Sequence, residues 1–290
     1  MNQPLVQHIL SLALGETVQI ISVSTISGGC IHNAQKITTD KGPYFMKLNR
    51  SDDLEMFRTE FSGLRLLANA KEIDVPVPLG YGIEGNQAYL LTEFIESSPR
   101  SDGFWVDFGQ SLANLHKNHQ NDRFGLSYDN YIGRLEQHND FHDDWLSFFI
   151  HQRLEIQLRL ALDHGYFDNS YLQRFKSFYA KLPELLPEEP PSLLHGDLWS
   201  GNFMIGGQSQ PVIIDPAVYY GNREIELSFT QMFGGFDPLF YQTYQDVYPL
   251  TPGFDKRVEI YNLYPSLVHV NMFGTSYMGG VDRVIRKYTY

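Results

Sequence analysis

Hydrophobic and β-branched residues follow a strand pattern across roughly the first fifty residues. A short apolar segment at residues 9–14 precedes them and predicts an amphipathic helix. It has neither the basic leader nor the apolar length of a signal peptide. The turn Asp40-Lys41-Gly42-Pro43 separates two of the expected strands. The pattern predicts three successive strands, at residues 19–26, 31–38 and 44–48.

The next segment changes to helical spacing. Between about residues 52 and 70 the apolar positions recur with the period of an amphipathic helix. Residues 75–78 contain two prolines and predict an edge segment, because proline donates no hydrogen bond to a strand ladder. Residues 87–95 predict a buried strand that runs into a polar connector at 96–99. We expect a lobe boundary there, which divides the chain into residues 1–95 and 96–290.

Beyond the connector the pattern is mainly helical, which predicts an α+β fold with two unequal lobes. The first lobe is a small, mainly antiparallel sheet with one key helix, and the second is larger and mainly helical. Pro265 is expected to kink the last of its helices. The helices predicted in the second lobe span about residues 105–117, 141–162, 169–182, 236–246 and 255–272.

Composition narrows the class of protein. A hydrophobic content of 42% with 19% charged residues is typical of a soluble globular chain, and no stretch has the roughly 20 apolar residues of a membrane span. The net charge of −12 argues against a nucleic-acid backbone or an anionic membrane as the main partner. Cys30 is the single cysteine, which excludes an intrachain disulfide and favours a reducing cytoplasm. Because ATP is itself an anion, a nucleotide site in this chain must carry a local positive charge despite the negative net charge.

The strongest chemical signal is the segment His195-Gly196-Asp197-Leu198-Trp199-Ser200-Gly201-Asn202, followed after a short apolar run by Asp215. Phosphoryl transfer needs a carboxylate that orients and deprotonates the attacking hydroxyl, and oxygen ligands that hold Mg²⁺ on the triphosphate. The spacing lets one tight loop aim Asp197 at the acceptor and Asn202 at the metal, with Asp215 approaching from the next strand. The alternative is that Asp197 and Asn202 only cap turns.

A lysine and a glutamate upstream extend this interpretation. Lys47 lies in an otherwise apolar strand, where an ammonium group needs an anion or a route to water. Glu60 lies on the apolar stripe of the following helix, between Phe57 and Leu64, where a carboxylate needs a cation. Kinases use such a pair to hold the lysine against the α- and β-phosphates of ATP. Glu55 is an alternative partner that points further from the stripe, and Lys47 on a solvated strand face is the simpler alternative.

Two further segments are candidates for nucleotide binding. Gly28, Gly29 and Cys30 separate the first two predicted strands, and adjacent glycines let backbone amides approach phosphate oxygens. A plain hairpin turn is the other explanation of that segment. The backbone of Glu93-Phe94-Ile95, at the end of the last strand before the connector, is expected to contact adenine.

The sequence after Asp215 indicates the size of the acceptor. It contains no D-F-G, and no A-P-E follows, which leaves little room for the activation segment that protein kinases use to hold peptides. A small acceptor is therefore expected. The last sixty or so residues are rich in aromatic side chains, which either line an acceptor pocket or pack in the core.

The motifs together resemble those of the fructosamine kinase (ketosamine kinase) family, a group of protein-kinase-like small-molecule kinases near the aminoglycoside phosphotransferases and choline kinases. The resemblance rests on the residues discussed above together with Asp-Pro-Ala at 215–217 and Gly-Asn-Arg-Glu at 221–224. It implies ATP and Mg²⁺ as cofactors and phosphorylation of a sugar-amine adduct on its 3-hydroxyl, and hence protein deglycation. It further implies that Asp197 is the base, that Asn202 and Asp215 are metal ligands, and that Trp199 flanks the acceptor.

Several alternatives stay open. The acceptor is either a small-molecule ketosamine of the fructosamine or ribulosamine type or a glycated protein, and another amino alcohol, such as an aminoglycoside or choline, is the second choice. A catalytically silent nucleotide-binding scaffold is a third. The Cys30 thiolate, near Lys47, is a candidate for oxidation to an intermolecular disulfide, which makes the protein a monomer or a redox-sensitive dimer. A small residue in a tight turn is the alternative role for Cys30.

Overall fold

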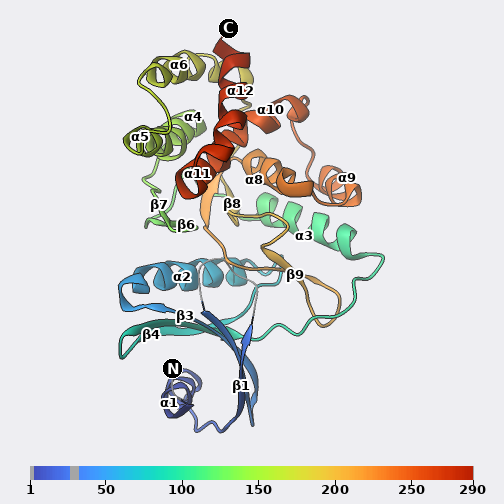
Figure 1. Ribbon diagram of the computed structural model, residues 1–290. Coiled ribbons are helices and arrows are strands. Elements are labelled where there is room, and N and C mark those ends of the chain that lie inside the picture. Colours follow the sequence, from blue (N-terminus) through green and yellow to red (C-terminus); the bar gives the residue numbers. More distant parts are fainter. Residues whose placement is uncertain (1–2, 27–32, 290) are drawn as a thin grey trace. The chain divides into compact units, whose positions relative to one another are not determined.

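The computed structural model describes residues 3–26 and 33–289 (Figure 1). Contacts between residues divide the chain into two compact units. The sheet unit consists of Met1–Phe104 and Phe203–Pro216, and the helical unit consists of Trp105–Asn202 and Ala217–Tyr290. The expected connector at 96–99 thus falls within the sheet unit, which continues to Phe104. The sheet unit also includes the later segment Phe203–Pro216. The predicted α+β class is confirmed.

The sheet unit is built on a five-stranded antiparallel sheet with the order β1-β2-β3-β5-β4. The first three strands overlap the predicted ones. The strand β4 was not predicted as such, because one proline and two glycines interrupt its pattern, although its place at the sheet edge fits the expected edge segment. The strands are β1 (Ile20–Ile26), β2 (Asn33–Thr39), β3 (Gly42–Arg50), β4 (Pro78–Glu84) and β5 (Gln87–Glu93).

One helix covers each face of this sheet (Figure 1). Residues of α1 (Gln3–Leu14) pack with Met46 and Leu48 of β3 in one buried cluster. Residues of α2 (Leu54–Ala70), which follows the 3-10 turn Ser51–Asp53, pack with Leu90 of β5 in the other. Since successive side chains of a strand point to opposite faces, Lys47 points to the α2 face. The alternation of β3 thus directs a single lysine toward a helix rather than toward solvent.

A short hairpin formed by β9 (Phe203–Ile205) and β10 (Pro211–Ile213) completes the sheet unit. The Ile213 N–H donates to the Asp74 carbonyl at 2.9 Å, and the Ser98 hydroxyl donates to the Gly206 carbonyl at 2.8 Å. The hairpin is therefore attached both to the segment after α2 and to the connector that follows β5. These attachments fix where β10 ends, two residues before Asp215.

The helical unit contains most of the helices, and two small sheets formed by β6 with β7 and by β8 with β11. The strands are β6 (Asn130–Ile132), β7 (Leu135–Gln137), β8 (Ser192–Leu194) and β11 (Tyr219–Gly221). The helices are α3 (Phe104–Asn118), α4 (Trp145–Phe148), a π-helical segment (Phe149–Leu154), α5 (Glu155–Asp163), α6 (Ser170–Tyr179), α7 (Leu182–Leu185), α8 (Arg223–Thr230), α9 (Pro238–Val247), α10 (Phe254–Tyr261), α11 (Leu263–Phe273) and α12 (Met278–Thr289), with 3-10 turns at Met232–Gly234 and Thr275–Tyr277.

Two predicted helices differ from the structure. The helix expected from residue 141 begins at Trp145, because Asp144 caps it by accepting the Ser147 N–H at 2.8 Å, and it passes through the π-helical segment. The helix expected at 255–272 is two helices, α10 and α11, separated at Asn262. Pro265 does not mark this break, since it lies in the first turn of α11, where a missing N–H removes no helical hydrogen bond.

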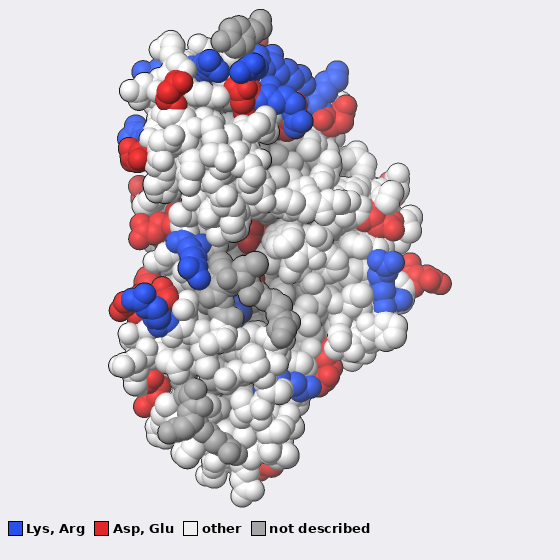
Figure 2. All heavy atoms as spheres, viewed as in Figure 1, with Lys and Arg blue, Asp and Glu red and all other residues white. Residues whose placement is uncertain are grey.

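Lys and Arg side chains gather at the end of the helical unit where α12 and α10 lie (Figure 2). The exposed basic residues there are Lys256, Arg283, Arg286 and Lys287. Arg286 pairs with Asp282 at 2.8 Å, and Lys287 pairs with Glu259. Acidic partners thus offset part of the positive charge of this surface.

Within the residues that the structure describes, no helix has the length and apolar character needed to cross a membrane.

Candidate active site

Lys47 is the centre of a buried ionic cluster in the sheet unit. Its ammonium nitrogen lies 2.7 Å from Glu60 Oε1 and 2.6 Å from Asp215 Oδ1. The side chains of Lys47 and Glu60 are 9% and 12% exposed, whereas that of Asp215 is 47% exposed. Glu55, the alternative partner, instead binds Arg58 one turn along α2. The structure therefore brings together Glu60 of α2 and Asp215, which follows β10, around the ammonium group of Lys47.

The charges of this cluster are coupled. Burial alone would lower the pKa of Lys47, but the attraction of Asp215 and Glu60 outweighs it and holds the Lys47 pKa above its ordinary value. The pKa of Glu60 is raised, because burial and the nearby Asp215 charge outweigh the attraction of Lys47. The lysine is thus protonated at neutral pH and is shared by two carboxyl groups. A site with one ammonium and two carboxyl groups can accept a further cation.

Asp215 has an unusual backbone conformation. Its φ angle is +57°, in the left-handed region that non-glycine residues seldom occupy. The preceding strand β10 is fixed by its attachments to Asp74 and the connector. Strained backbone of this kind is found where the surrounding structure holds a side chain in a particular direction, often at functional sites.

The loop predicted to be catalytic lies in the helical unit and begins where β8 ends. His195 and Leu198 are fully buried, which anchors the loop on both sides of Asp197. The Asp197 N–H donates to His195 Nδ1 at 3.3 Å. The Asn202 amide nitrogen donates to the Asp197 carbonyl at 2.8 Å and to its carboxylate Oδ2 at 2.9 Å. Asn202 thus closes the turn as well as touching the acid, and its side-chain oxygen is the atom suited to a cation.

Gly196 explains why this loop needs glycine before the acid. Its φ angle is +85°, and a Cβ atom there would lie 2.0 Å from the Ala217 carbonyl oxygen. The neighbouring hydrogen bond from the Ala217 N–H to the His195 carbonyl, at 2.9 Å, holds the two segments together. No other residue type fits this position without moving the loop.

Trp199 leads from the loop to a group of aromatic side chains in the helical unit. Its ring lies 5.7 Å from that of Phe233, which lies 5.2 Å from His269. Phe233 is 47% exposed and, like Asp215, has a φ of +57° in the left-handed region. We call this group the aromatic surface: Trp199, Phe233, His269, Phe273 and Tyr277.

The residues predicted for the rest of the nucleotide site are only partly described. Gly28, Gly29 and Cys30 lie outside the described residues, so the phosphate-loop and redox predictions stay predictions. The Glu93 N–H donates to the Val77 carbonyl at 2.9 Å, and the ring of Phe94 lies under the Lys36 ammonium at 4.0 Å. The Glu93 N–H is thus engaged within the sheet unit, and the adenine contact of residues 93–95 stays a prediction.

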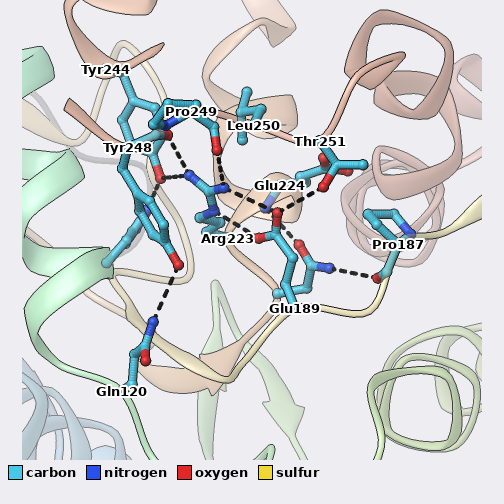
Figure 3. A network of polar contacts seen from close by, with 12 residues as sticks. Gln120, Pro187, Glu189, Arg223, Glu224, Tyr244, Tyr248, Pro249, Leu250 and Thr251 are labelled. Carbon is cyan, nitrogen blue, oxygen red and sulfur yellow. Dashed lines mark hydrogen bonds and ion pairs between the residues drawn. The ribbon is translucent and has the colours of Figure 1, made fainter. Parts of the chain in front are cut away.

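A carboxylate that sequence reasoning missed contacts the predicted catalytic loop. Glu226, on α8, accepts hydrogen bonds from the backbone of His195 and Gly196. Three of the four residues at 223–226 are charged, and because the structure buries this helix completely, each of them needs a partner. The arginine among them binds Glu189 through two hydrogen bonds of 2.7 and 3.0 Å (Figure 3). Nothing in the sequence indicates which partners these are.

In residues 3–26 and 33–289, no group of three or more His, Cys, Asp or Glu side chains is arranged to hold a metal ion. Magnesium on a nucleotide needs fewer protein ligands, because waters and phosphate oxygens supply the others. The side-chain oxygens of Asn202 and Asp215 are each of the hard type that Mg²⁺ prefers, and the prediction that they are metal ligands stays a prediction.

A five-stranded antiparallel sheet with a strand lysine paired to a helix glutamate, and a separate helical unit, is the architecture of the protein-kinase-like phosphotransferases. Solved structures agree with this class. The aminoglycoside phosphotransferase APH(4)-Ia matches with a TM-score of 0.63 at 16% identity, covering 98% of this chain and 99% of that one, which supports the fold alone. A candidate fructosamine-3-kinase from Haemophilus somnus matches with a TM-score of 0.89 at 28% identity, covering 99% and 97%.

The family model described as fructosamine kinase matches residues 2–290, and the chain belongs to this family. A probable ketoamine kinase from Synechocystis is 37% identical over 281 residues, which are 96% of this chain and 94% of the relative. The protein-ribulosamine 3-kinase of Arabidopsis thaliana is 36% identical and covers 96% of this chain and 85% of the relative. The prediction of an ATP-dependent small-molecule kinase is confirmed.

Proposed function

We propose that this ketosamine kinase transfers the γ-phosphoryl group of ATP to the 3-hydroxyl of a protein-bound sugar-amine adduct, with Mg²⁺ bound at the nucleotide. The observation that carries the proposal is the position of Lys47 between Glu60 and Asp215. A lysine held in this way is charged, buried and directed, which are the requirements for binding the α- and β-phosphates. Family membership supplies the sugar-amine class of acceptor.

The nucleotide end of the site takes its roles from the ionic cluster. Lys47 binds phosphate oxygens, and Glu60 holds its ammonium in direction through the 2.7 Å contact. Asp215 and Asn202 are the residues that would hold Mg²⁺, which would supply positive charge to the phosphates of the nucleotide. Backbone groups at Phe94 and Ile95 bind adenine.

The acceptor end takes its roles from the loop. Asp197 accepts the proton of the 3-hydroxyl as that oxygen attacks the γ-phosphorus. The Asn202 amide nitrogen, 2.9 Å from Asp197 Oδ2, limits the directions in which the carboxylate can turn. Positioning of this kind is the main contribution that a protein makes to phosphoryl transfer.

The aromatic surface is the proposed place for the adduct and the polypeptide that carries it. A sugar ring has an apolar face that stacks on aromatic rings, and Trp199 is two residues beyond the base. Gly201 allows the indole to lie against the loop, since a Cβ atom there would be 2.4 Å from ring carbons of Trp199. Phe233 and Phe273, 47% and 54% exposed, extend apolar area outward from it. The relatives named as protein-ribulosamine 3-kinases make a ribulosamine on a protein the first acceptor to test.

The test is phosphorylation of a ribulosamine-modified peptide, with the position of the new phosphate read by NMR. The wild-type protein is expected to form the 3-phosphate, and Asp197→Asn to lower kcat by about 10²–10⁴-fold, the usual contribution of a general base. Asp246→Asn, a change at an exposed acid elsewhere in the helical unit, is the matched control. Full activity of Asp197→Asn on this acceptor would remove the proposed role of the loop.

The carrier is tested separately. Phe233→Ala is expected to raise KM for the modified peptide about 10-fold, the weight of roughly 1.4 kcal/mol of lost contact, with little effect on free ribulosamine. Phe141→Ala, another exposed phenylalanine of the same unit, is the control. Equal effects of Phe233→Ala on the peptide and on the free adduct would exclude a carrier contact at this residue.

The remaining assignments are also proposals. A single cysteine in 290 residues favours a cytoplasmic location. A redox-sensitive dimer through Cys30 is tested by non-reducing electrophoresis after mild peroxide, where a solely monomeric band argues against the link.

A further inference from the structure

Ser209, in the turn of the β9–β10 hairpin, binds the backbone of residues 96–101, which are the polar connector after β5 and the two residues beyond it. The Ser209 hydroxyl oxygen accepts the Ser101 N–H at 2.7 Å. The same hydroxyl donates to the Pro99 carbonyl at 3.1 Å. One side chain thus uses both hydrogen-bonding roles of a hydroxyl on two peptide groups that lie more than a hundred residues earlier in the chain.

Two further contacts to the connector start at Gly206, which is buried in the same turn. Its carbonyl accepts the Ser98 hydroxyl at 2.8 Å, and its backbone forms an isolated antiparallel bridge with Ser97. A Cβ atom at Gly206 would lie 2.5 Å from the side chain of Gln210, so the turn is closely packed behind these contacts. We call the turn at residues 206–210 the clasp.

The clasp is fixed to another part of the sheet unit. The Gly206 N–H donates to the Gln210 carbonyl at 2.8 Å, and the Ser209 N–H donates to the Gly206 carbonyl at 2.9 Å, which closes the turn. The Gln210 side-chain nitrogen donates to the Asp74 carboxylate at 3.2 Å, and the Ile213 N–H donates to the Asp74 carbonyl at 2.9 Å. The clasp therefore holds the connector against the segment that follows α2.

The backbone of Ser209 shows that its hydroxyl group has a particular role. Its φ angle is +65°, in the left-handed region that glycine occupies more readily than serine. A glycine at this position would form the turn with less strain but would have no hydroxyl to bind the connector. Strained residues of this kind persist where the surrounding contacts over-determine them, often next to functional sites.

The backbone that is proposed to bind adenine, at Phe94 and Ile95, lies between two fixed points. Before it, Glu93 is the last residue of β5 and pairs with Tyr44 of β3. After it, Ser97 is bridged to the clasp. The directions of the few peptide groups between these points therefore depend on the sheet and the clasp together.

Lys36 of β2 contacts the same segment through side chains. Its ammonium lies 3.0 Å from Glu96 and 4.0 Å from the centre of the Phe94 ring. The Lys36 and Glu96 side chains are 29% and 63% exposed, and ion pairs in contact with water stabilise little. The clasp, which binds backbone groups, therefore has the larger effect on where the peptide groups of the connector point.

We propose that Ser209 is a positioning residue for nucleotide selection, which through the clasp holds the connector in the arrangement that binds adenine in preference to guanine. The proposal rests on the adenine contact proposed above. Adenine presents an amino group where guanine presents a carbonyl oxygen, so a connector with fixed backbone donors and acceptors fits one base and opposes the other. ATP and GTP carry the same triphosphate, so the ratio of their affinities reports on the base alone.

The test compares two changes to glycine at left-handed residues of the sheet unit, made in the full-length protein. Ser209→Gly removes the hydroxyl and relieves the backbone. Lys71→Gly is the matched control, because Lys71 is an exposed residue at the end of α2 with a φ of +58°. The measurements are the dissociation constants of ATP and GTP in the presence of Mg²⁺, the thermal midpoint, and hydrogen exchange of the peptide that covers residues 94–101.

Ser209→Gly is expected to lower the preference for ATP over GTP about 3- to 10-fold, the weight of about one hydrogen bond, and to speed exchange at residues 94–101. Its thermal midpoint should stay near that of wild type, because the relief of strain offsets the greater freedom of glycine in the unfolded chain. Lys71→Gly is expected to keep the wild-type nucleotide preference and the wild-type exchange. An unchanged preference in Ser209→Gly would overturn the proposal, and so would equal falls in the two variants.

A second variant tests the clasp at a different contact. Ser98→Ala removes the hydroxyl that donates to the Gly206 carbonyl and leaves Ser209 in place, and it is expected to lower the same preference about 2- to 5-fold. A wild-type preference in Ser98→Ala would overturn the clasp as the source of the effect. Binding of ATP and GTP needs no acceptor, so a wild-type protein that prefers ATP but is inactive on ribulosamine would count against the proposed function and leave this test intact. A wild-type protein without preference for ATP would overturn the present proposal alone.

Discussion

The ionic cluster of the sheet unit permits a double-mutant cycle in the folding free energy. Lys47→Met removes the ammonium group but keeps a side chain of similar length. It leaves two carboxyl groups that were both within 2.7 Å of that ammonium, and Glu60 is only 12% exposed. Glu60→Gln removes one acceptor but leaves Lys47 with Asp215 at 2.6 Å.

The structure sets the sizes of the effects. Removing one partner of a fully buried ion pair costs about 3–5 kcal/mol, because an uncompensated charge stays in the interior. Asp215 is 47% exposed and can be solvated, so we expect about 2–4 kcal/mol for Lys47→Met at neutral pH. Glu60→Gln is expected to cost about 1 kcal/mol, the net value of one hydrogen bond. The double variant should recover about 1–2 kcal/mol relative to Lys47→Met, since no buried charge is left without a partner.

Urea unfolding followed by far-UV circular dichroism gives the free energy of unfolding of the wild type, the two single variants and the double variant. Equal slopes of this free energy against urea concentration show that the same surface is exposed on unfolding in each protein. Additive losses would mean that Lys47 and Glu60 do not interact in solution. A Lys47→Met protein within about 0.5 kcal/mol of wild type would mean that the cluster is solvated, and the reasoning on its charges would be wrong.

Two further predictions concern the helical unit. Gly196→Ala is expected to lower the thermal midpoint sharply or to prevent folding, since the new Cβ would lie 2.0 Å from the Ala217 carbonyl oxygen. The control is Gly279→Ala on α12, where a Cβ meets nothing within 4 Å and the change should be neutral or stabilising. Equal thermal midpoints for the two variants would contradict this prediction. Burial holds the pKa of His269 below its ordinary value of 6.5, although a hydrogen bond to the Pro265 carbonyl opposes the shift. As pH falls through 6.5, His269 of the unfolded chain takes up a proton more readily than His269 of the folded chain, so stability is lost. The thermal midpoint should therefore fall more steeply between pH 7.5 and 5.5 in wild type than in His269→Gln. Parallel slopes for the two proteins would contradict this prediction.

Local patterns in the sequence predicted many of the helices and strands. The alternation at 44–48 and the helical stripe with Phe57 and Leu64 predicted β3 and α2, because each depends on residues near one another in the chain. The same stripe selected Glu60 over Glu55. Element ends and breaks were less predictable: the cap at Asp144 and the separation of α10 from α11 depend on packing that no periodicity records.

The site divides in the same way. The sequence by itself determined the catalytic-loop motif and the downstream acid through their spacing. It determined Lys47 because an ammonium group is costly in an apolar strand without an anionic partner. Only the tertiary structure decided that Asp215, 168 residues after Lys47, shares its ammonium, and that Glu226 holds the backbone of a loop 30 residues before it. Contacts at such separations depend on how whole strands and helices pack. Their directions are fixed by the burial of distant apolar residues, which no local pattern contains.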